Sequence, residues 1–331
     1  MRLNNQLARG SPGTTNSVKS QLIFLGVFIV IAAAVFVLFD WLTGGNFLEW
    51  TNIRIILASM IYPTFMAWGM CFLFACGFSD MSWGSVVVLA SFGAGVFGNA
   101  FGFAGVILAG IIIGAVLVFF NFCIYTFTNI PTWIASISLA LAYEAVSVYL
   151  RVGKITGQYV EAPLNDSLRV LGQFPWNLIV LFAGAIVVYF IYNRAKIGFY
   201  IRAIGGNVTI ARSLGVNTVK TLLRVGIICG LLIGAAAVLQ QSYNGYTTIK
   251  SGLSSIVLTF QPLAAALLAD ILQKKINVII AVPICAFLMF AAFNLLSLLH
   301  VPSGTLQEAL LALFLITFAV MGQRNVKGVV K

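Results

Sequence analysis

The sequence predicts an all-α polytopic membrane protein with about ten transmembrane helices. Its residues are 61% hydrophobic and only 8% charged, and its mean hydropathy is +1.04. A soluble domain has about a quarter charged residues, so this chain has too little polar surface to face water. Apolar runs of about 20 residues, the length that spans a bilayer, recur along the chain. The lysines and arginines also fall mostly on one side of these runs, as they do in membrane proteins.

Each predicted span is a largely apolar run bounded by polar or turn-forming residues. The ten runs are 21–43, 53–76, 83–100, 103–127, 132–150, 175–193, 224–242, 253–271, 277–298 and 305–322. The first run is too long for the core of a signal peptide, and no small-residue cleavage site follows Asp40. We therefore expect it to be retained as a span.

The basic residues predict the orientation of the chain. With ten spans, fourteen lysines and arginines fall on one side, which the positive-inside rule assigns to the cytoplasm. Five fall on the other side: Arg54, Arg151, Lys154, Arg169 and Lys250. We therefore expect a multi-pass membrane protein with a cytoplasmic tail at 1–20, a transmembrane domain at 21–323 and a cytoplasmic tail at 324–331. The net charge of +11 is read as a topology signal, not as a nucleic-acid patch, because it is spread over four separate segments.

Two connections are long enough to have structure of their own. The outer loop 151–174 contains glycines and prolines and is expected to be ordered, with a short helix. The cytoplasmic loop 194–223 alternates apolar and basic residues. Within it, 207–214 is predicted to be a short amphipathic helix between glycine turns at 205–206 and 215.

Prolines and a pattern of connections suggest where helices break or repeat. Pro63, Pro131, Pro262 and Pro283 are the predicted break points. A possible internal two-fold repeat pairs spans two and three, joined by a turn at 77–80, with spans eight and nine, joined by a turn at 270–276. Both pairs run in the same directions, so the repeat is expected to be parallel.

No catalytic motif is present in the sequence. It lacks GxxxxGK[ST], HExxH, GxSxG and CxxC, and it has one histidine. Its five cysteines lie within apolar runs without metal-ligand spacing, as small apolar residues do. We expect no catalytic residue, no metal site and no cofactor bound by this chain.

Polar residues within spans are the candidates for a translocation pathway. Glu144 is costly inside a span and could contact substrate, carry a proton or make a structural hydrogen bond to a neighbouring helix. Asp80 and Asp270 are placed at cytoplasmic span ends, where capping or pairing with Lys274 or Lys275 is expected. The other candidates suit a hydroxyl-rich solute, although interhelical hydrogen bonding or an interfacial aromatic belt would also explain them. They are Asn121, Trp133, Gln240, Gln241, Tyr243, Asn244 and Asn294.

One cytoplasmic segment carries a family resemblance. The residues GFYIRAIGGN at 198–207 and ARSLGVN at 211–217 resemble the permease subunits of ribose/galactose-type sugar ABC importers. In that family a stretch like G-x-Y-x-x-A-x-G-G-N follows a span and carries the coupling helix. The resemblance extends over nearly the whole chain in hydropathy pattern.

The resemblance implies a function and a set of partners. It implies the membrane subunit of an importer for a monosaccharide or related polar solute, with a second permease, an extracytoplasmic solute-binding protein and a separate ATP-binding subunit that holds ATP and Mg. The residues that it assigns to ATPase coupling are Gly205, Gly206, Asn207, Ala211, Arg212, Ser213, Leu214 and Gly215.

Two departures from the family pattern leave alternatives open. The segment 77–84 reads GFSDMSWG where the family reads like G-G-I-D-L-S-V-G, and 268–275 reads LADILQKK where a glycine-rich turn is usual. The second departure raises the alternative of a heterodimer with another permease in place of a homodimer. An ion-coupled transporter with Glu144 as proton site, a facilitator and a membrane enzyme are the rival functions.

Overall fold

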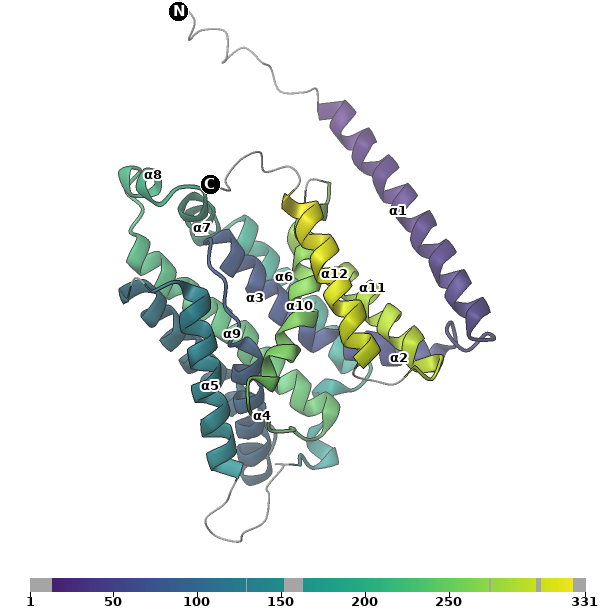
Figure 1. Ribbon diagram of the computed structural model, residues 1–331, viewed down its shortest axis with the longest axis horizontal. Helices are drawn as coiled ribbons and strands as arrows, with labels where there is room; N and C mark the ends of the chain where they lie inside the picture. The colour runs from purple at the N-terminus through teal and green to yellow at the C-terminus, as the bar shows by residue number, and fades with distance from the viewer. Residues whose placement is uncertain (1–13, 129, 152–162, 274, 302–304, 324–331) are drawn as a thin grey trace, which may run out of the picture.

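The computed structural model describes residues 14–128, 130–151, 163–273, 275–301 and 305–323, and every regular element in these ranges is helical (Figure 1). Within them, seven helical segments are long and apolar enough to cross a membrane. The α-helices are α1 Thr14–Leu42, α2 Trp50–Ser59, α3 Ile61–Ala75, α4 Trp83–Phe127, α5 Thr132–Arg151, α6 Trp176–Asn193, α7 Lys196–Gly206, α8 Val208–Ser213, α9 Thr218–Asn244, α10 Val257–Leu272, α11 Val278–Leu298 and α12 Thr305–Gln323. Three short 3-10 helices are η1 Asp166–Leu168, η2 Val170–Gly172 and η3 Ser254–Ile256.

Helix α4 is a hairpin of two spans. Its 45 residues would extend for about 67 Å if straight, more than twice the thickness of a hydrocarbon core. Gly102 breaks it with φ 70° and ψ −154°, a conformation that favours glycine. The two halves then run back along each other so closely that a Cβ on Gly105 would lie 2.1 Å from the Phe97 carbonyl oxygen. With α4 counted twice, and with the shorter apolar helices Val30–Leu42 and Leu306–Met321, the described chain agrees with the ten predicted spans.

The centre of the bundle is formed by α3, α4 and α9. Glycines bring α4 and α9 almost into backbone contact, because a Cβ on Gly114 would lie 2.5 Å from the Gly234 Cα. Gly230 meets Ala115 in the same way one turn away. Such small-residue contacts are how membrane helices approach closely, and here they fix the position of the helix that follows the cytoplasmic loop.

Two of the four predicted proline breaks, those at Pro262 and Pro283, are wrong. Pro63 follows the junction of α2 and α3 at Met60, and Pro131 precedes the first residue of α5, so both mark helix starts. Pro262 and Pro283 instead lie inside α10 and α11, which continue through them. A proline at these positions removes one backbone donor without ending the helix.

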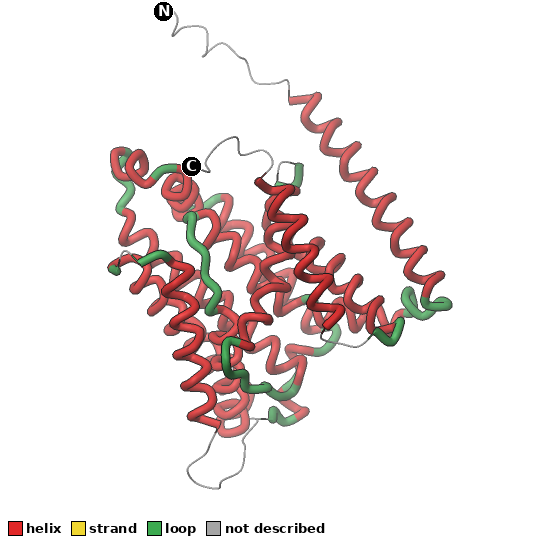
Figure 2. The backbone as a smooth tube through the Cα atoms, in the orientation of Figure 1, coloured by secondary structure: helices red, strands yellow, loops and turns green. Residues whose placement is uncertain are grey.

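The segments 76–82 and 245–253 are re-entrant: each enters the bundle instead of turning back at its surface. Figure 2 shows the connection from α3 to α4 running down between the helices. Asp80, predicted at the cytoplasmic end of a span, lies on this segment and is 3% exposed, and it accepts the amide of Ser82 just before α4. On the opposite side, 245–253 leads from the end of α9 back into the bundle, where η3 and α10 begin.

The re-entrant segments bear on the predicted internal repeat. The segment 76–82 enters the bundle from one end, and 245–253, which the sequence did not pair with it, enters from the other. The parallel repeat of spans two and three with spans eight and nine stays a prediction.

The ends of the bundle separate the charged connections as expected. The start of α1 and the end of α12 lie at the same end of the bundle as α7 and α8, whereas η1 and η2 lie at the other end (Figure 1). In the outer loop 151–174, residues 152–162 lie outside the described residues, and the remainder holds η1 and η2.

The α4–α9 contact gives a stability prediction. Gly114→Leu places a side chain where the Gly234 backbone lies, so we expect a loss of about 1–3 kcal/mol in the free energy of unfolding. Thermal unfolding followed by a thiol-reactive dye measures it, because four of the five cysteines are buried. The control is Gly26→Ala on α1, which meets nothing within 4 Å and is expected to unfold like the wild type. Equal unfolding temperatures for both variants would contradict this packing.

Candidate functional site

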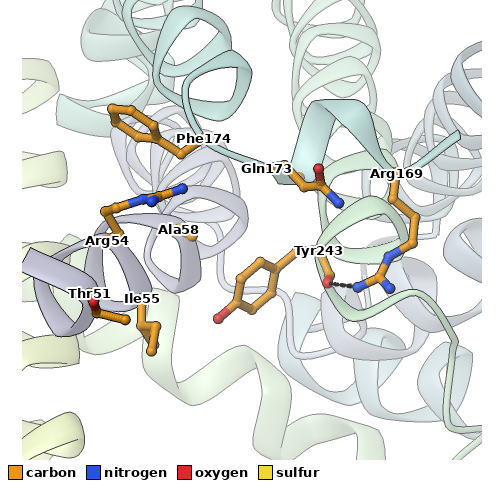
Figure 3. Close-up of a pocket in the computed structure, with 9 residues that line it drawn as sticks. Thr51, Arg54, Ile55, Ala58, Arg169, Gln173, Phe174 and Tyr243 are labelled. Atoms are coloured by element: carbon orange, nitrogen blue, oxygen red, sulfur yellow. Dashed lines mark hydrogen bonds between the residues drawn. The ribbon is translucent and has the colours of Figure 1, made fainter. Parts of the chain in front are cut away.

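A cavity of about 450 Å³ opens at the end of the bundle that holds η1 and η2 (Figure 3). Three parts of the chain form it: α2, the η2–α6 connection and the end of α9. None of the described residues that line it is acidic. They are Thr51, Arg54, Ile55, Ala58, Arg169, Gly172, Gln173, Phe174 and Tyr243.

The cavity combines aromatic faces with hydrogen-bond donors. The guanidinium carbon of Arg54 lies 5.0 Å from the centroid of the Phe174 ring, and Trp50 meets the same ring edge to face at 5.9 Å. The Tyr243 side chain projects between the two arginine-bearing walls (Figure 3). Cavities of this volume with a few polar groups are typical of small-molecule sites.

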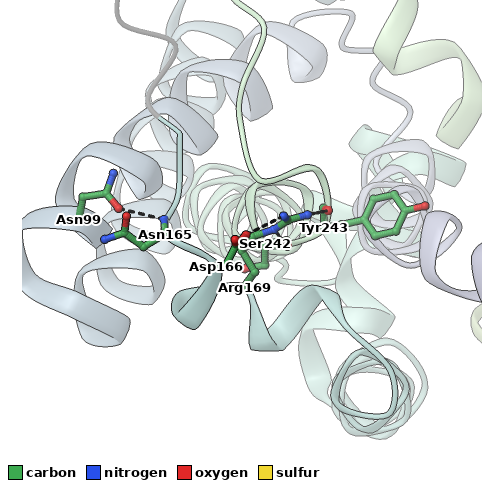
Figure 4. A network of polar contacts seen from close by, with 6 residues as sticks. All are labelled: Asn99, Asn165, Asp166, Arg169, Ser242 and Tyr243. Atoms are coloured by element: carbon green, nitrogen blue, oxygen red, sulfur yellow. Dashed lines mark hydrogen bonds and ion pairs between the residues drawn. The ribbon is translucent and has the colours of Figure 1, made fainter.

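Arg169 joins the outer loop to the end of α9 in the wall of this cavity (Figure 4). Its guanidinium donates to the Tyr243 carbonyl oxygen through Nη2 at 2.8 Å and to the Ser242 carbonyl oxygen through Nε at 3.3 Å. Nη1 forms an ion pair with Asp166 at 3.1 Å. Because a Cβ on Gly172 would lie 2.3 Å from the Tyr243 nitrogen, η2 rests directly on the end of α9.

A second contact attaches the same loop to the α4 hairpin. Asn99 donates through Nδ2 to the Pro163 carbonyl oxygen at 2.5 Å, and its Oδ1 accepts from the Asn165 amide at 3.2 Å (Figure 4). The outer loop is therefore bound to two different spans. The sequence identified Arg54 and Arg169 only as basic residues of the outer face, because nothing in the sequence indicates their packing.

A cavity of about 390 Å³ lies at the opposite end, where α3, α6, α7 and α10 meet. Its lining includes Arg202, Tyr192 and Asp270. Arg202 donates to the Tyr192 carbonyl oxygen at 2.9 Å and lies over the Tyr192 and Phe199 rings, at 5.3 and 5.1 Å from their centroids. Asp270 accepts a hydrogen bond from Gln273.

The predicted pathway residues are not gathered in one cavity. Tyr243 lines the outer cavity, and Asn244 is exposed beside it at the end of α9. Asn294 exchanges two 2.9 Å hydrogen bonds with Asn52, which joins α11 to α2. Trp133 is 55% exposed on the outer surface of α5.

The remaining predicted pathway residues are buried. The Gln241 amide oxygen accepts from the Thr247 hydroxyl, whereas the buried Oε1 of Gln240 has no hydrogen-bond partner among the described residues. Asn121 donates to the Ser82 hydroxyl at 2.7 Å, and its oxygen accepts from the Tyr143 hydroxyl at 2.6 Å.

Glu144 is 2% exposed and has backbone partners. Its Oε2 accepts from the Leu253 amide at 2.7 Å, and its Oε1 accepts from the Ser255 amide at 2.8 Å. Of the three alternatives for Glu144, this geometry favours the structural hydrogen bond, here to the start of η3.

The predicted short helix of the cytoplasmic loop is present as α8. Asn207 caps it, because its side-chain oxygen accepts from the Ile210 amide at 3.0 Å. Gly215 follows it with φ 82°, as expected for a glycine turn. The other predicted turn is wrong: Gly205 and Gly206 are the last residues of α7, and the chain turns at Asn207.

Helix α8 is attached on one side and exposed on the other. Ala211 is buried against Ile204 and Val216, and Arg212 donates through Nε to the Thr218 hydroxyl at 3.3 Å. The exposed side carries apolar residues, with Ile210 59% and Leu214 74% exposed. Ser213 is also exposed.

Gly205 joins this element to the first re-entrant segment. A Cβ at Gly205 would lie 2.2 Å from the Ala75 carbonyl oxygen, so the end of α7 touches the last residue of α3. Residues 76–82 begin there. A displacement of α7 and α8 would therefore act directly on the end of α3, where residues 76–82 enter the bundle.

The fold and these sites define a polytopic membrane permease with an exposed element at one end. Residues 52–320 match the family described as branched-chain amino acid transport system / permease component, and the chain belongs to this family. The resemblance to permeases of sugar importers is confirmed by the relatives below.

Three relatives illustrate the similarity. The chain is 27% identical over 232 residues to the autoinducer 2 import system permease protein of Yersinia pestis (strain Pestoides F), over 68% of this chain and 64% of that protein. It is 22% identical to the fructose import permease protein of Rhizobium meliloti, over 67% of each. It is 27% identical to the galactose/methyl galactoside import permease protein of Haemophilus influenzae (strain ATCC 51907 / DSM 11121 / KW20 / Rd), over 44% of this chain and 46% of that one. No solved structure matches the chain.

The Arg169 contacts give a second prediction. Arg169→Gln loses charged donors to the end of α9, so we expect the free energy of unfolding to fall by about 1–3 kcal/mol and the outer loop to become more sensitive to protease. The control is Asp166→Asn, which removes an ion pair whose acid is 93% exposed. An exposed pair of this kind contributes little, about 0–1 kcal/mol. If both variants lose the same stability, the carbonyl contacts do not hold the loop.

Proposed function

We propose that this chain is the transmembrane permease subunit of an ATP-driven ABC importer for a monosaccharide or related polar solute. In this proposal an extracytoplasmic binding protein delivers the solute at the η1–η2 end. ATP and Mg are bound by a separate ATP-binding subunit at the other end, and a second permease completes the pathway. The chain itself hydrolyses nothing.

The observation that carries the proposal is the structure of α8. A permease that relies on a separate ATPase needs a rigid element to which a soluble partner can bind. Helix α8 presents Ile210 and Leu214 outward and is fixed to the bundle through Ala211 and Arg212. An exposed apolar patch rimmed by basic residues is typical of a protein interaction site.

The orientation belongs to the same proposal. Helix α1 starts and α12 ends at the α8 end of the bundle, which also carries Arg202, Arg212, Lys220 and Arg224 (Figure 1). The positive-inside rule supports placing this end, and both termini, in the cytoplasm. The membrane is then the inner membrane of a bacterium.

The outer cavity supports the solute class. Hydroxyl-rich solutes combine apolar ring faces with donors and acceptors, and the cavity offers Phe174 and Tyr243 beside Arg54 and Gln173. The relatives named for fructose and galactose import agree with such a solute. Tyr243 and the 169–174 part of the outer loop line this cavity. The 243–252 connection and the described part of 151–174 are the proposed contact with the binding protein.

The rival with Glu144 as a proton carrier has less support. Both of its carboxylate oxygens accept backbone amides, so protonation would remove an acceptor from a buried donor. The heterodimer remains a proposal based on the unusual 268–275 segment. Activity of a transporter that contains this permease alone would exclude it.

The coupling element is tested by the double variant Ile210→Asp, Leu214→Asp. Two charges on the exposed face of α8 should abolish co-purification of the ATP-binding subunit in mild detergent and lower uptake at least about tenfold, because charges in an apolar contact lose their hydration. Val170→Asp, an exposed apolar residue of the other end, is the control and should keep the ATPase bound. Replacement of 207–214 by a Gly-Ser linker without loss of uptake would overturn the proposal.

A further inference from the structure

Two helices begin inside the bundle, and their first residues touch. The Gly84 amide at the start of α4 donates to the Thr259 hydroxyl on α10 at 2.9 Å. A Cβ on Gly84 would lie 2.0 Å from the carbonyl oxygen of Ser255 in η3. The re-entrant segments 76–82 and 245–253, which lead to these starts, come from opposite ends of the bundle.

A buried carboxylate accepts backbone amides beside each interior start, at Ser82 before α4 and at the start of η3, which runs into α10. Asp80 accepts from the Ser82 amide at 2.7 Å and from the Ser82 hydroxyl at 2.6 Å. Glu144 accepts from the amides of Leu253 and Ser255. The first backbone amides of a helix have no partner within the helix, so in a membrane interior they need acceptors of this kind.

The two carboxylates differ in origin. Asp80 lies on the same segment as the amide that it accepts, whereas Glu144 is supplied by α5. Glu144 lies twelve residues after the start of α5, about 18 Å along the helix. It also supports an unusual conformation, because Leu253 has φ 66°, in the left-handed region that favours glycine.

The residue before Glu144 reaches the other re-entrant segment. The Tyr143 hydroxyl donates to Asn121 Oδ1 at 2.6 Å. Asn121 in turn donates to the Ser82 hydroxyl at 2.7 Å and to Asp80 Oδ2 at 3.2 Å. Two consecutive residues of α5 are therefore bonded to both segments, one directly and one through Asn121.

The segment held by Glu144 borders an open cavity. Ser251 and Gly252 are exposed and line a space of about 600 Å³ together with Leu141, Ala145 and Tyr149 on α5. Non-helical backbone within a bilayer is tolerated only where protein or water covers it. The exposed backbone at Ser251 and Gly252 therefore lies beside a largely apolar face of α5.

We propose that Tyr143 and Glu144 are a pair of positioning residues through which α5 holds the two re-entrant segments in a fixed relation. When one segment moves, the other follows, so the inner and outer parts of the bundle change together. The role in transport rests on the proposed importer function, whereas the linkage itself is a property of this chain. The two side-chain oxygens of Glu144 accept backbone amides, and this role needs no proton transfer.

Cysteine labelling in membranes tests the linkage without any partner. Ser251→Cys reports on the outer segment and Ser79→Cys on the inner one. Glu144→Gln should change the maleimide labelling rate at position 251, which is already exposed, because the Leu253 amide loses the carboxylate that holds this segment. It should also change the rate at position 79. Tyr143→Phe removes the hydroxyl that bonds Asn121, so it should change the labelling rate at position 79 and, through the linkage, also at position 251.

The matched control is Ser147→Ala, one turn further along α5. Ser147 is also buried, but among the described residues its hydroxyl bonds within α5, to the Tyr143 carbonyl oxygen. We expect no change at either reporter. If Glu144→Gln alters only position 251 and Tyr143→Phe only position 79, the linkage is wrong. If Glu144→Gln does not accumulate, Tyr143→Phe decides alone, through its effect at 251.

Uptake measurements on Glu144 variants distinguish this inference from the proposed importer function. In the assembled transporter, Glu144→Gln should lower the maximal rate with KM within about twofold, and Glu144→Asp should restore part of the rate, since a carboxylate acceptor returns. A proton carrier would instead make uptake insensitive to the proton gradient in Glu144→Gln. Linked labelling without ATPase co-purification would keep the inference and reject the importer.

Discussion

Backbone amides inside a bilayer must find acceptors within the protein, and the architecture of this chain depends on how two helices meet that requirement. Helix α4 and the η3–α10 segment begin in the interior of the bundle. Asp80 accepts the amide of Ser82, the residue before α4, and Glu144 accepts the amides of Leu253 and Ser255 at the start of η3. This explains why a chain with only eight acidic residues places two of them in its core. The backbone contact at Gly84 then brings the two helix starts together.

A continuous set of contacts runs from the exposed face of α8 to this interior junction. Ala211 packs on Ile204 of α7, and the end of α7 touches the end of α3 at Gly205. The re-entrant segment that starts there carries Asp80 and leads to Gly84, which meets η3. The opposite end of the bundle reaches the same place through 245–253. In the proposed importer, a movement of α8 would act at the start of this set of contacts.

The sequence predicted the spans well because bilayer thickness sets their length, and hydropathy reports it directly. It also predicted α8, since an Asn cap and a following glycine are local signals. It did not predict the re-entrant segments, because 76–82 has the composition of an ordinary turn. The partners of Glu144 are backbone amides more than a hundred residues away, which no residue type reveals. Arg169 likewise bonds to carbonyl oxygens, so its role in the outer cavity became visible only with the fold.

Helix α4 and the η3–α10 segment begin inside the bundle, where Asp80 accepts the amide of Ser82 and Glu144 accepts the amides of Leu253 and Ser255. A single-particle structure of the full chain in a lipid nanodisc tests this arrangement most directly. It should show Trp83 at the start of α4 inside the bilayer, with the Glu144 carboxylate within hydrogen-bond distance of the Leu253 and Ser255 amides. A helix α4 that starts at the membrane surface, or a Glu144 side chain turned toward lipid or open water, would contradict the account.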